Sequence, residues 1–152
     1  MAETSWQKLG YSWIRAQLSA NATLSALVGG RFYARRVPET DAYPCVVIAY
    51  GGVSEAQGGA ERSQLISVIN NDRIGVWLLF QVKAVCKADS LDKLDEIAGE
   101  LDRTLHRANG AVAGGKVLAC LFRNVIEYDN TNDAGVTFYF NGAFYEVLVQ
   151  KV

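Results

Sequence analysis

The chain has little of what marks several functional classes. Its 152 residues include one histidine, two prolines and three cysteines, and 15 basic residues against 16 acidic ones give a formal net charge of −1. A protein that binds nucleic acid non-specifically would carry a basic excess, which is missing here. Like charges form no block that would draw the chain to an anionic membrane, and no apolar run approaches the roughly 20 residues of a membrane-spanning helix.

The three cysteines do not suggest a disulfide framework. Cys45, Cys86 and Cys120 are odd in number, each lies in or beside an apolar run, and no C-x-x-C spacing occurs. We therefore expect reduced, buried thiols and no metal site. The first residues lack the basic and then apolar layout of a signal peptide, so we expect a soluble protein kept in a reducing compartment.

Candidates for catalysis are equally few. His106 is the only histidine, and it lies at the end of a predicted helix, where a charged imidazole ring favours the negative helix end. Thiols inside strands have raised pKa values, so the cysteines are poor nucleophiles. The glycine pairs at residues 51–52 and 58–59 match no phosphate-binding pattern. We expect no catalytic residue, no cofactor and no metal ligand, and keep an enzyme with a buried cysteine as an alternative hypothesis.

What the chain does have is hydrophobic residues, which make up half of it. Their 3.6-residue spacing predicts helices over residues 5–20 and 89–107. A short helical turn over residues 24–28 is expected to begin at Thr23 and to end at the glycines that follow Val28. Residues 1–152 are expected to form one domain.

Several apolar runs predict strands between and after these helices. The last two are alternating runs joined by Asn141-Gly142, which predicts a hairpin turn there. The predicted strands cover residues 31–37, 45–50, 75–85, 116–128, 136–140 and 143–149. The fold class is therefore α+β, with a mainly antiparallel sheet flanked by an N-terminal helix and one long central helix.

Three tryptophans, seven tyrosines and six phenylalanines exceed what one small core is expected to hold, and interface cores are rich in these residues. The terminal strands also carry few charges to protect an exposed edge. Both features favour a subunit interface, with an ordinary large core as the alternative. The glycine-rich segment at residues 51–63 is either an arm that reaches a neighbour or a surface loop. The candidate interface residues are Trp6, Trp13, Glu55, Gln57, Arg62, Phe138, Phe140, Phe144, Tyr145 and Val147.

Four stretches of the chain follow a known order. L-x-x-L-V-G-G-R and two aromatics occupy residues 24–33, and Y-P-x-V-V-I occupies residues 43–48. V-W at residues 76–77 precedes A-D-S-L-D-K-L-D-E-I-A at residues 88–98. D-x-G-V and then G-x-x-Y-x-V lie within residues 133–147. In this order the motifs resemble the tail completion, or tail terminator, proteins of long-tailed bacteriophages.

The resemblance implies a structural α+β subunit that assembles, usually as a hexameric ring, on the completed tail tube. Such a ring stops tube polymerisation and offers a surface for head joining. Its partners would be other copies of the chain, the tail tube protein and a head-side connector or stopper protein, with DNA only as passing cargo and no membrane. The protein would assemble in the host bacterial cytoplasm and reside in the tail or neck of the virion.

Two other functions stay open on the sequence alone. The chain could be another neck protein, such as the head-side stopper, which would share the ring but not the partners. It could also be a small-ligand-binding α+β module whose aromatic residues line a pocket.

Overall fold

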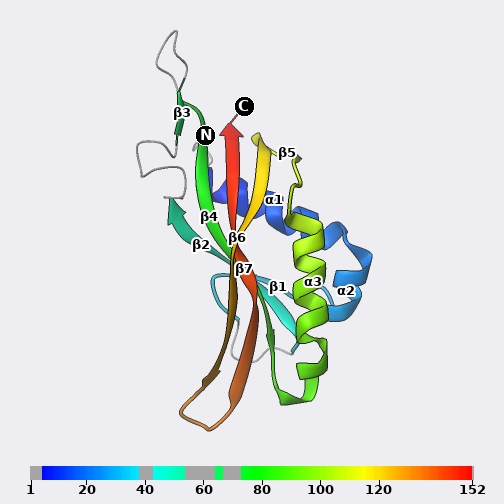
Figure 1. Ribbon diagram of the computed structural model, residues 1–152. Coiled ribbons are helices and arrows are strands. Elements are labelled where there is room, and N and C mark those ends of the chain that lie inside the picture. Colours follow the sequence, from blue (N-terminus) through cyan, green and yellow to red (C-terminus); the bar gives the residue numbers. More distant parts are fainter. Residues whose placement is uncertain (1–4, 38–42, 54–63, 67–72, 152) are drawn as a thin grey trace.

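The computed structural model describes residues 5–37, 43–53, 64–66 and 73–151 (Figure 1). Glu55, Gln57 and Arg62 of the glycine-rich segment lie outside these residues. The helices are α1 Trp6–Ala20, α2 Ala22–Val28, the 3-10 helix η2 Ala88–Lys93 and α3 Leu94–Leu105. The strands are β1 Phe32–Ala34, β2 Cys45–Val53, β3 Gln64–Ile66, β4 Arg73–Cys86, β5 Gly110–Val112, β6 Gly115–Thr131 and β7 Thr137–Lys151.

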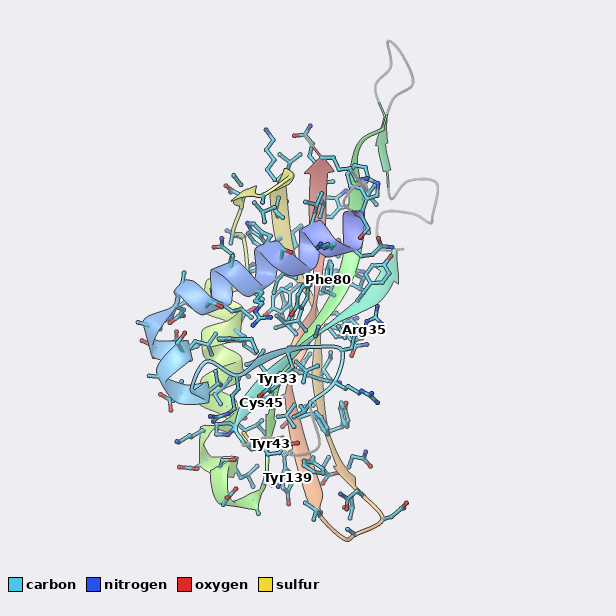
Figure 2. All side chains as sticks on the ribbon, turned by 180° about the vertical axis from the view of Figure 1, so that it is seen from behind. Tyr33, Arg35, Tyr43, Cys45, Phe80 and Tyr139 are labelled. Carbon is cyan, nitrogen blue, oxygen red and sulfur yellow. The ribbon has the colours of Figure 1, made fainter. Side chains whose placement is uncertain are left out.

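One curled sheet organises these elements. Its strand order is β1-β2-β4-β7-β6-β5, and β3 pairs with the start of β4. The β1–β2 pair is parallel and the other described pairs are antiparallel, which confirms the predicted α+β class. Figure 2 shows α1 lying across one face of the sheet, and α1 and α3 contribute to the main core on that face. A smaller cluster on the opposite face contains no residue of the described helices, and we call this the helix-free face. None of the helices in the described ranges has the length and apolar character needed to span a bilayer.

The main core lies between the helices and the sheet. Gly10 lets α1 approach β4 closely, because a Cβ there would lie 2.7 Å from the ring of Phe80, which Figure 2 shows beside α1. Side chains of α1 and α3 recur at helical spacing and meet alternating side chains of the long strands. Core members are Leu9, Trp13, Ile14, Leu18, Phe80, Val82, Ile97, Leu101, Leu105, Tyr145 and Val147.

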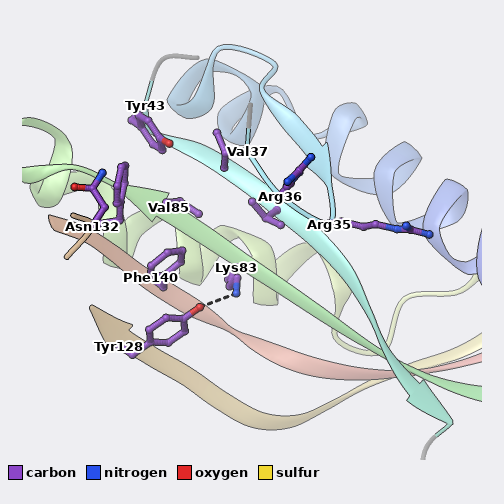
Figure 3. A pocket seen from close by; sticks show the side chains of 11 residues that line it. Arg35, Arg36, Val37, Tyr43, Lys83, Val85, Tyr128, Asn132 and Phe140 are labelled. Atoms are coloured by element: carbon purple, nitrogen blue, oxygen red, sulfur yellow. Dashed lines mark hydrogen bonds between the residues drawn. The ribbon is translucent and has the colours of Figure 1, made fainter. Parts of the chain in front are cut away.

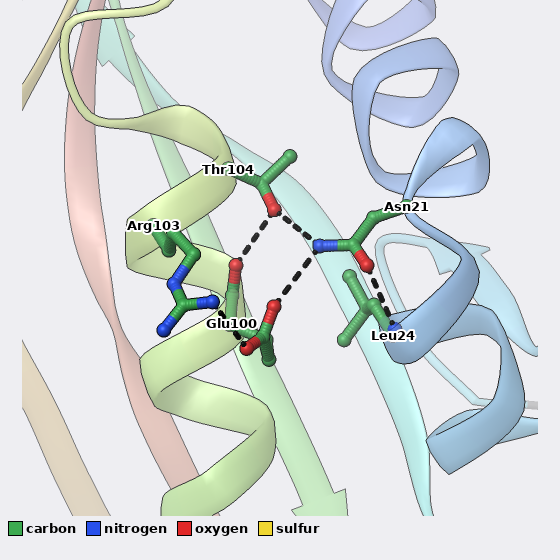
Figure 4. Close-up of polar contacts among 5 residues, drawn as sticks. All are labelled: Asn21, Leu24, Glu100, Arg103 and Thr104. Atoms are coloured by element: carbon green, nitrogen blue, oxygen red, sulfur yellow. Dashed lines mark hydrogen bonds and ion pairs between the residues drawn. The ribbon is translucent and has the colours of Figure 1, made fainter.

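The corner between α1 and α2 is held by Asn21 rather than by the predicted Thr23. The Asn21 Oδ1 atom accepts a hydrogen bond from the backbone N–H of Leu24 at 3.0 Å and so caps α2 (Figure 4). The Asn21 amide donates to Thr104 Oγ1 at 2.8 Å and to Glu100 Oε2 at 3.1 Å. One side chain therefore starts α2 and ties the α1–α2 corner to α3.

The hairpin predicted at Asn141-Gly142 is wrong. β7 runs straight through both residues, paired with β4 on one side and β6 on the other. A Cβ on Gly142 would collide with the carbonyl oxygen of Val82 and lie 2.5 Å from the Cα of Lys83. Glycine is needed here for close strand packing and not for a turn. The turn lies at residues 132–136, where Asn132 Oδ1 accepts from the backbone N–H groups of Ala134 and Val136, both at 3.0 Å.

The long helix predicted over residues 89–107 is shorter at both ends. Residues 88–93 form η2, in which Leu91 is 41% exposed. The helix ends at Leu105, with His106 as its C-cap. The Nδ1 atom of His106 accepts a hydrogen bond from the backbone N–H of Phe122 at 3.1 Å. His106 thus joins the end of α3 to β6.

Candidate assembly interface

Three of the candidate interface residues belong to the core of their own subunit. Trp13 and Val147 are 0% exposed and Tyr145 is 1% exposed. The Tyr145 hydroxyl donates to Asp102 Oδ1 at 3.0 Å, and burial, followed by the nearby Asp102 carboxylate, raises the pKa of this phenol. These side chains have no surface left for a neighbour, so the structure corrects their assignment to an interface.

The other described candidates lie in two places. Trp6 lies at the start of α1, where the Nζ atom of Lys151 is 4.7 Å from the centre of its ring. Phe138, Phe140 and Phe144 are partly exposed on β7. They alternate with Tyr145 along the strand and so lie on the helix-free face. The structure therefore brings together the phenylalanines of β7 but not Trp6, and their contact with a partner stays a prediction.

The expectation that the terminal strands expose an edge is wrong for β7, which has neighbours on both sides. It is β6 that has a free edge. β5 pairs only with its first residues, and Arg107 N–H donates to the Cys120 carbonyl oxygen at 2.7 Å just beyond. From residue 123 to Thr131, the described residues place a strand only on the β7 side. Val125 is 63% exposed there and Tyr128 is 44% exposed.

A groove of about 620 Å³ lies on the helix-free face and carries cations beside aromatic rings (Figure 3). Lys83 Nζ donates to the Tyr128 hydroxyl at 2.8 Å and lies 5.1 Å from the centre of the Phe140 ring. We call this the basic groove. Its lining residues are Arg35, Arg36, Val37, Tyr43, Val47, Lys83, Val85, Tyr128, Asn132, Phe138 and Phe140.

A second groove of about 430 Å³ lies between the start of α3 and the β6–β7 hairpin. It contains three carboxylates and no basic residue. Asp95 Oδ1 accepts from Asn141 Nδ2 at 2.9 Å, while Glu127 and Asp129 are exposed on β6. We call this the acidic groove. Its lining residues are Leu91, Leu94, Asp95, Glu127, Tyr128, Asp129, Tyr139 and Phe140.

Chemistry of a catalytic kind has little support in the described residues. Cys45, Cys86 and Cys120 are buried, and they form no disulfide with one another. Burial raises the pKa of Cys86, and burial together with Asp102 raises the pKa of Cys120 to about 12, so these two thiols stay protonated at neutral pH. Across the same residues, no three His, Cys, Asp or Glu side chains gather as a possible metal site.

Sequence reasoning missed the charged residues of both grooves. Arg35-Arg36 follows the aromatic pair of β1, and Glu127 and Asp129 alternate along β6, so weak signals exist for each. Lys83 lies within β4, whose apolar run predicts a buried strand, so the sequence alone does not indicate that its side chain lines a groove. Only the sheet order reveals that the two acidic residues lie on β6 while the two arginines follow β1, four strands away in that order.

A family model described as "Tail completion protein gp17" matches residues 13–138 of the chain. The chain belongs to the gp17 tail completion family. This match confirms the resemblance found in the sequence, and it makes the protein a structural component of a phage-type tail and virion. No curated protein sequence matches this gp17-family chain at a significant level.

Two solved structures resemble the gp17-family chain in fold. One is a chain from the virion of a native gene transfer agent particle, at 18% identity and a TM-score of 0.61, with 90% of this chain and 91% of that chain covered. The other carries no descriptive name and aligns at 18% identity and a TM-score of 0.51, with 93% of this chain and 94% of that chain covered. At this identity the similarity is one of fold.

Proposed function

We propose that the protein forms a ring that caps the tail tube. The resemblance to tail terminator proteins implies that this ring is a hexamer. The ring stops tube polymerisation and offers the surface to which the head side joins. The observation that carries this function is the tail completion family match over residues 13–138. Residues 1–152 act in it as one domain.

The geometry supports an assembly role over an enzymatic one. The three cysteines are buried, the pKa values of Cys86 and Cys120 are raised, and no metal-binding group occurs among the described residues, so these residues offer no evident reactive centre. A free strand edge and two charged grooves instead offer large surfaces for other protein chains. The fold shared with a chain of a gene transfer agent virion agrees with a place in a tail-like particle.

In this role the partners are other copies of the chain, the tail tube protein and a head-side connector or stopper. DNA passes through the ring as cargo, and the formal net charge of −1 suits a channel that does not hold it. The protein assembles in the cytoplasm of the bacterial host and stays at the end of the tail.

Deletion of the gene from its phage genome tests this function. We expect tail tubes of uncontrolled length and few joined heads by negative-stain electron microscopy. Purified protein added to extracts of the deletion strain should restore fixed tube length and infectious particles, and a gold label on the protein should mark the head-proximal tube end. The matched control is the same extract supplied with buffer alone.

Tubes of normal length and normal head joining in the deletion strain would refute the proposal. Tubes of normal length that fail to join heads, with the label on the head side, would instead identify the protein as a head-side stopper. Multi-angle light scattering of the purified protein over a concentration series gives an independent measure of ring mass.

A further inference from the structure

Opposite charges lie towards the two sides of the sheet. In the strand order, β1 is at one edge and the free part of β6 is at the other, with β2, β4 and β7 between them. Along this order four strand spacings separate β1 from β6, and the curl of the sheet brings Tyr128 of β6 into the same groove as Arg35 and Arg36. Arg35 and Arg36 follow β1, whereas Glu127 and Asp129 lie on β6. A contact between these two surfaces on different copies is therefore head-to-tail.

The β7 residues that pair with the exposed carboxylates of β6 are uncharged, so the free edge of β6 is negative. The nearest cation on that strand is Arg123, whose Nε atom lies 2.8 Å from Oε1 of the buried Glu146. That ion pair turns the guanidinium towards β7. Glu127 and Asp129 remain exposed, and Asp95 joins them in the acidic groove.

The basic groove has the matching character. Arg35 and Arg36 are exposed. Lys83 lies in the same groove, among the aromatic rings. Glu39 and Asp41, which follow in the sequence, lie outside the described residues. An acidic strand edge with exposed apolar side chains fits a basic groove lined by rings, because charge and apolar surface are complementary at once.

The backbone at Arg35 is a second sign that this side chain has a role. Its φ angle is 69°, in the left-handed region that side-chain-bearing residues enter at a cost and glycine enters freely. A residue held there against local preference is a common feature of functional sites.

We propose that the free edge of β6, with its acidic groove, docks against the Arg35–Arg36 end of the basic groove on the next copy of the chain. The contact is heterologous, and its repetition forms a ring when the rotation between neighbouring copies closes. This inference rests on the proposed ring and specifies which two surfaces build it. The backbone groups of residues 123–131 that face away from β7 have no strand partner among the described residues, and they take part as an added strand edge.

Charge reversal on exposed residues tests the contact with little risk to the fold. One variant carries Arg35→Glu and Arg36→Glu, and the other carries Glu127→Arg and Asp129→Arg. Each should weaken self-association at least about a hundredfold, since like charges then face each other. The control, Lys8→Glu with Arg15→Glu on the exposed side of α1, makes the same charge change elsewhere and should leave association unchanged.

Mixing provides the decisive readout. Each variant alone should be monomeric by light scattering, while an equimolar mixture should recover the oligomer, because every contact between unlike copies is again complementary. A chain with all four changes should also recover it. Rescue by mixing cannot arise from a folding defect, and circular dichroism of each variant checks the fold directly.

The outcomes separate this inference from the proposed function. A wild-type protein that is a single copy in solution and on purified tails would overturn both. A wild-type ring that both double variants leave intact would overturn the inference alone, and loss of tail binding in those variants would then assign the grooves to another tail protein. Disruption by both variants without rescue in the mixture or in the fourfold variant would overturn the head-to-tail arrangement.

Discussion

Replacement of Asn21 by alanine should destabilise the subunit well beyond the effect of an ordinary surface substitution. Asn21 is half-buried at the corner between α1 and α2, and its side chain makes three hydrogen bonds. One of them caps α2 through Leu24, and two reach Glu100 and Thr104 on α3. Alanine removes all three and leaves the partners to find water.

The magnitude follows from these contacts. Loss of an N-cap side chain costs about 1 kcal/mol. Each lost side-chain hydrogen bond adds about 1 kcal/mol, and the bond to a carboxylate is worth somewhat more. Water access to this part-buried corner returns a fraction, so we expect the free energy of unfolding to fall by about 2–3 kcal/mol. Asn21→Ser keeps a capping oxygen but loses the link to α3, and should cost about 1–2 kcal/mol.

Urea unfolding followed by circular dichroism measures this loss. With a slope near 2 kcal/mol per molar urea, typical of a chain this long, the midpoint should fall by roughly 1–1.5 M. Asn109→Ala, at an exposed position after α3, is the matched control and should shift the midpoint by no more than about 0.3 M. A loss below about 1 kcal/mol in Asn21→Ala would refute the idea that this side chain ties the helices together.

Three further perturbations follow from the structure. Gly142→Ala forces a Cβ against the backbone of β4 and should lower the melting temperature by roughly 6–12 °C. The control is Gly99→Ala, whose Cβ would meet nothing within 4 Å and which should raise the melting temperature slightly. Equal small effects of the two substitutions would contradict the close strand packing at Gly142. Arg35→Gly relieves a left-handed backbone and should raise the free energy of unfolding by roughly 0.5 kcal/mol in urea titrations. Arg36→Gly is the control and should lower the free energy of unfolding. If both substitutions lower it, backbone strain at Arg35 is refuted. Burial raises the pKa of Cys120 from 9.0 to about 12, so above pH 9 the unfolded thiol loses its proton while the buried thiol keeps it. The folded state then binds more protons than the unfolded state, and stability falls with rising pH by about 1.4 kcal/mol per pH unit. Urea midpoints of the wild type and of Cys120→Ala between pH 8.5 and 10.5 should therefore converge, and parallel curves would rule this contribution out.

Elements whose pattern repeats were predictable from the sequence. The apolar spacing of α1 and α3 and the hydrophobic run of β4 each contain enough residues for the period to stand out. The hairpin prediction at Asn141-Gly142 was wrong because an Asn-Gly pair is compatible both with a tight turn and with the close approach of a neighbouring strand. Only the position of Lys83 on β4, almost sixty residues earlier in the chain, decides between them.

The candidate interface was predicted less well, for a related reason. Composition reveals an excess of aromatic residues but not which of them one chain can bury, so Trp13 and Tyr145 were assigned to a surface that they do not reach. The edge of a sheet is defined by pairing across distant parts of the chain. β7 is central because it pairs with both β4 and β6, and no short sequence motif indicates either pairing.

The uninterrupted course of β7 has a mechanical consequence. Fifteen extended residues span roughly 50 Å, so one strand runs from the tip of the β6–β7 hairpin, at the bottom of Figure 1, to the opposite end of the subunit. A force applied along that axis loads the hydrogen bonds to β4 and β6 together, in shear, instead of opening them one after another. The subunit therefore resists extension most strongly along the direction of β7.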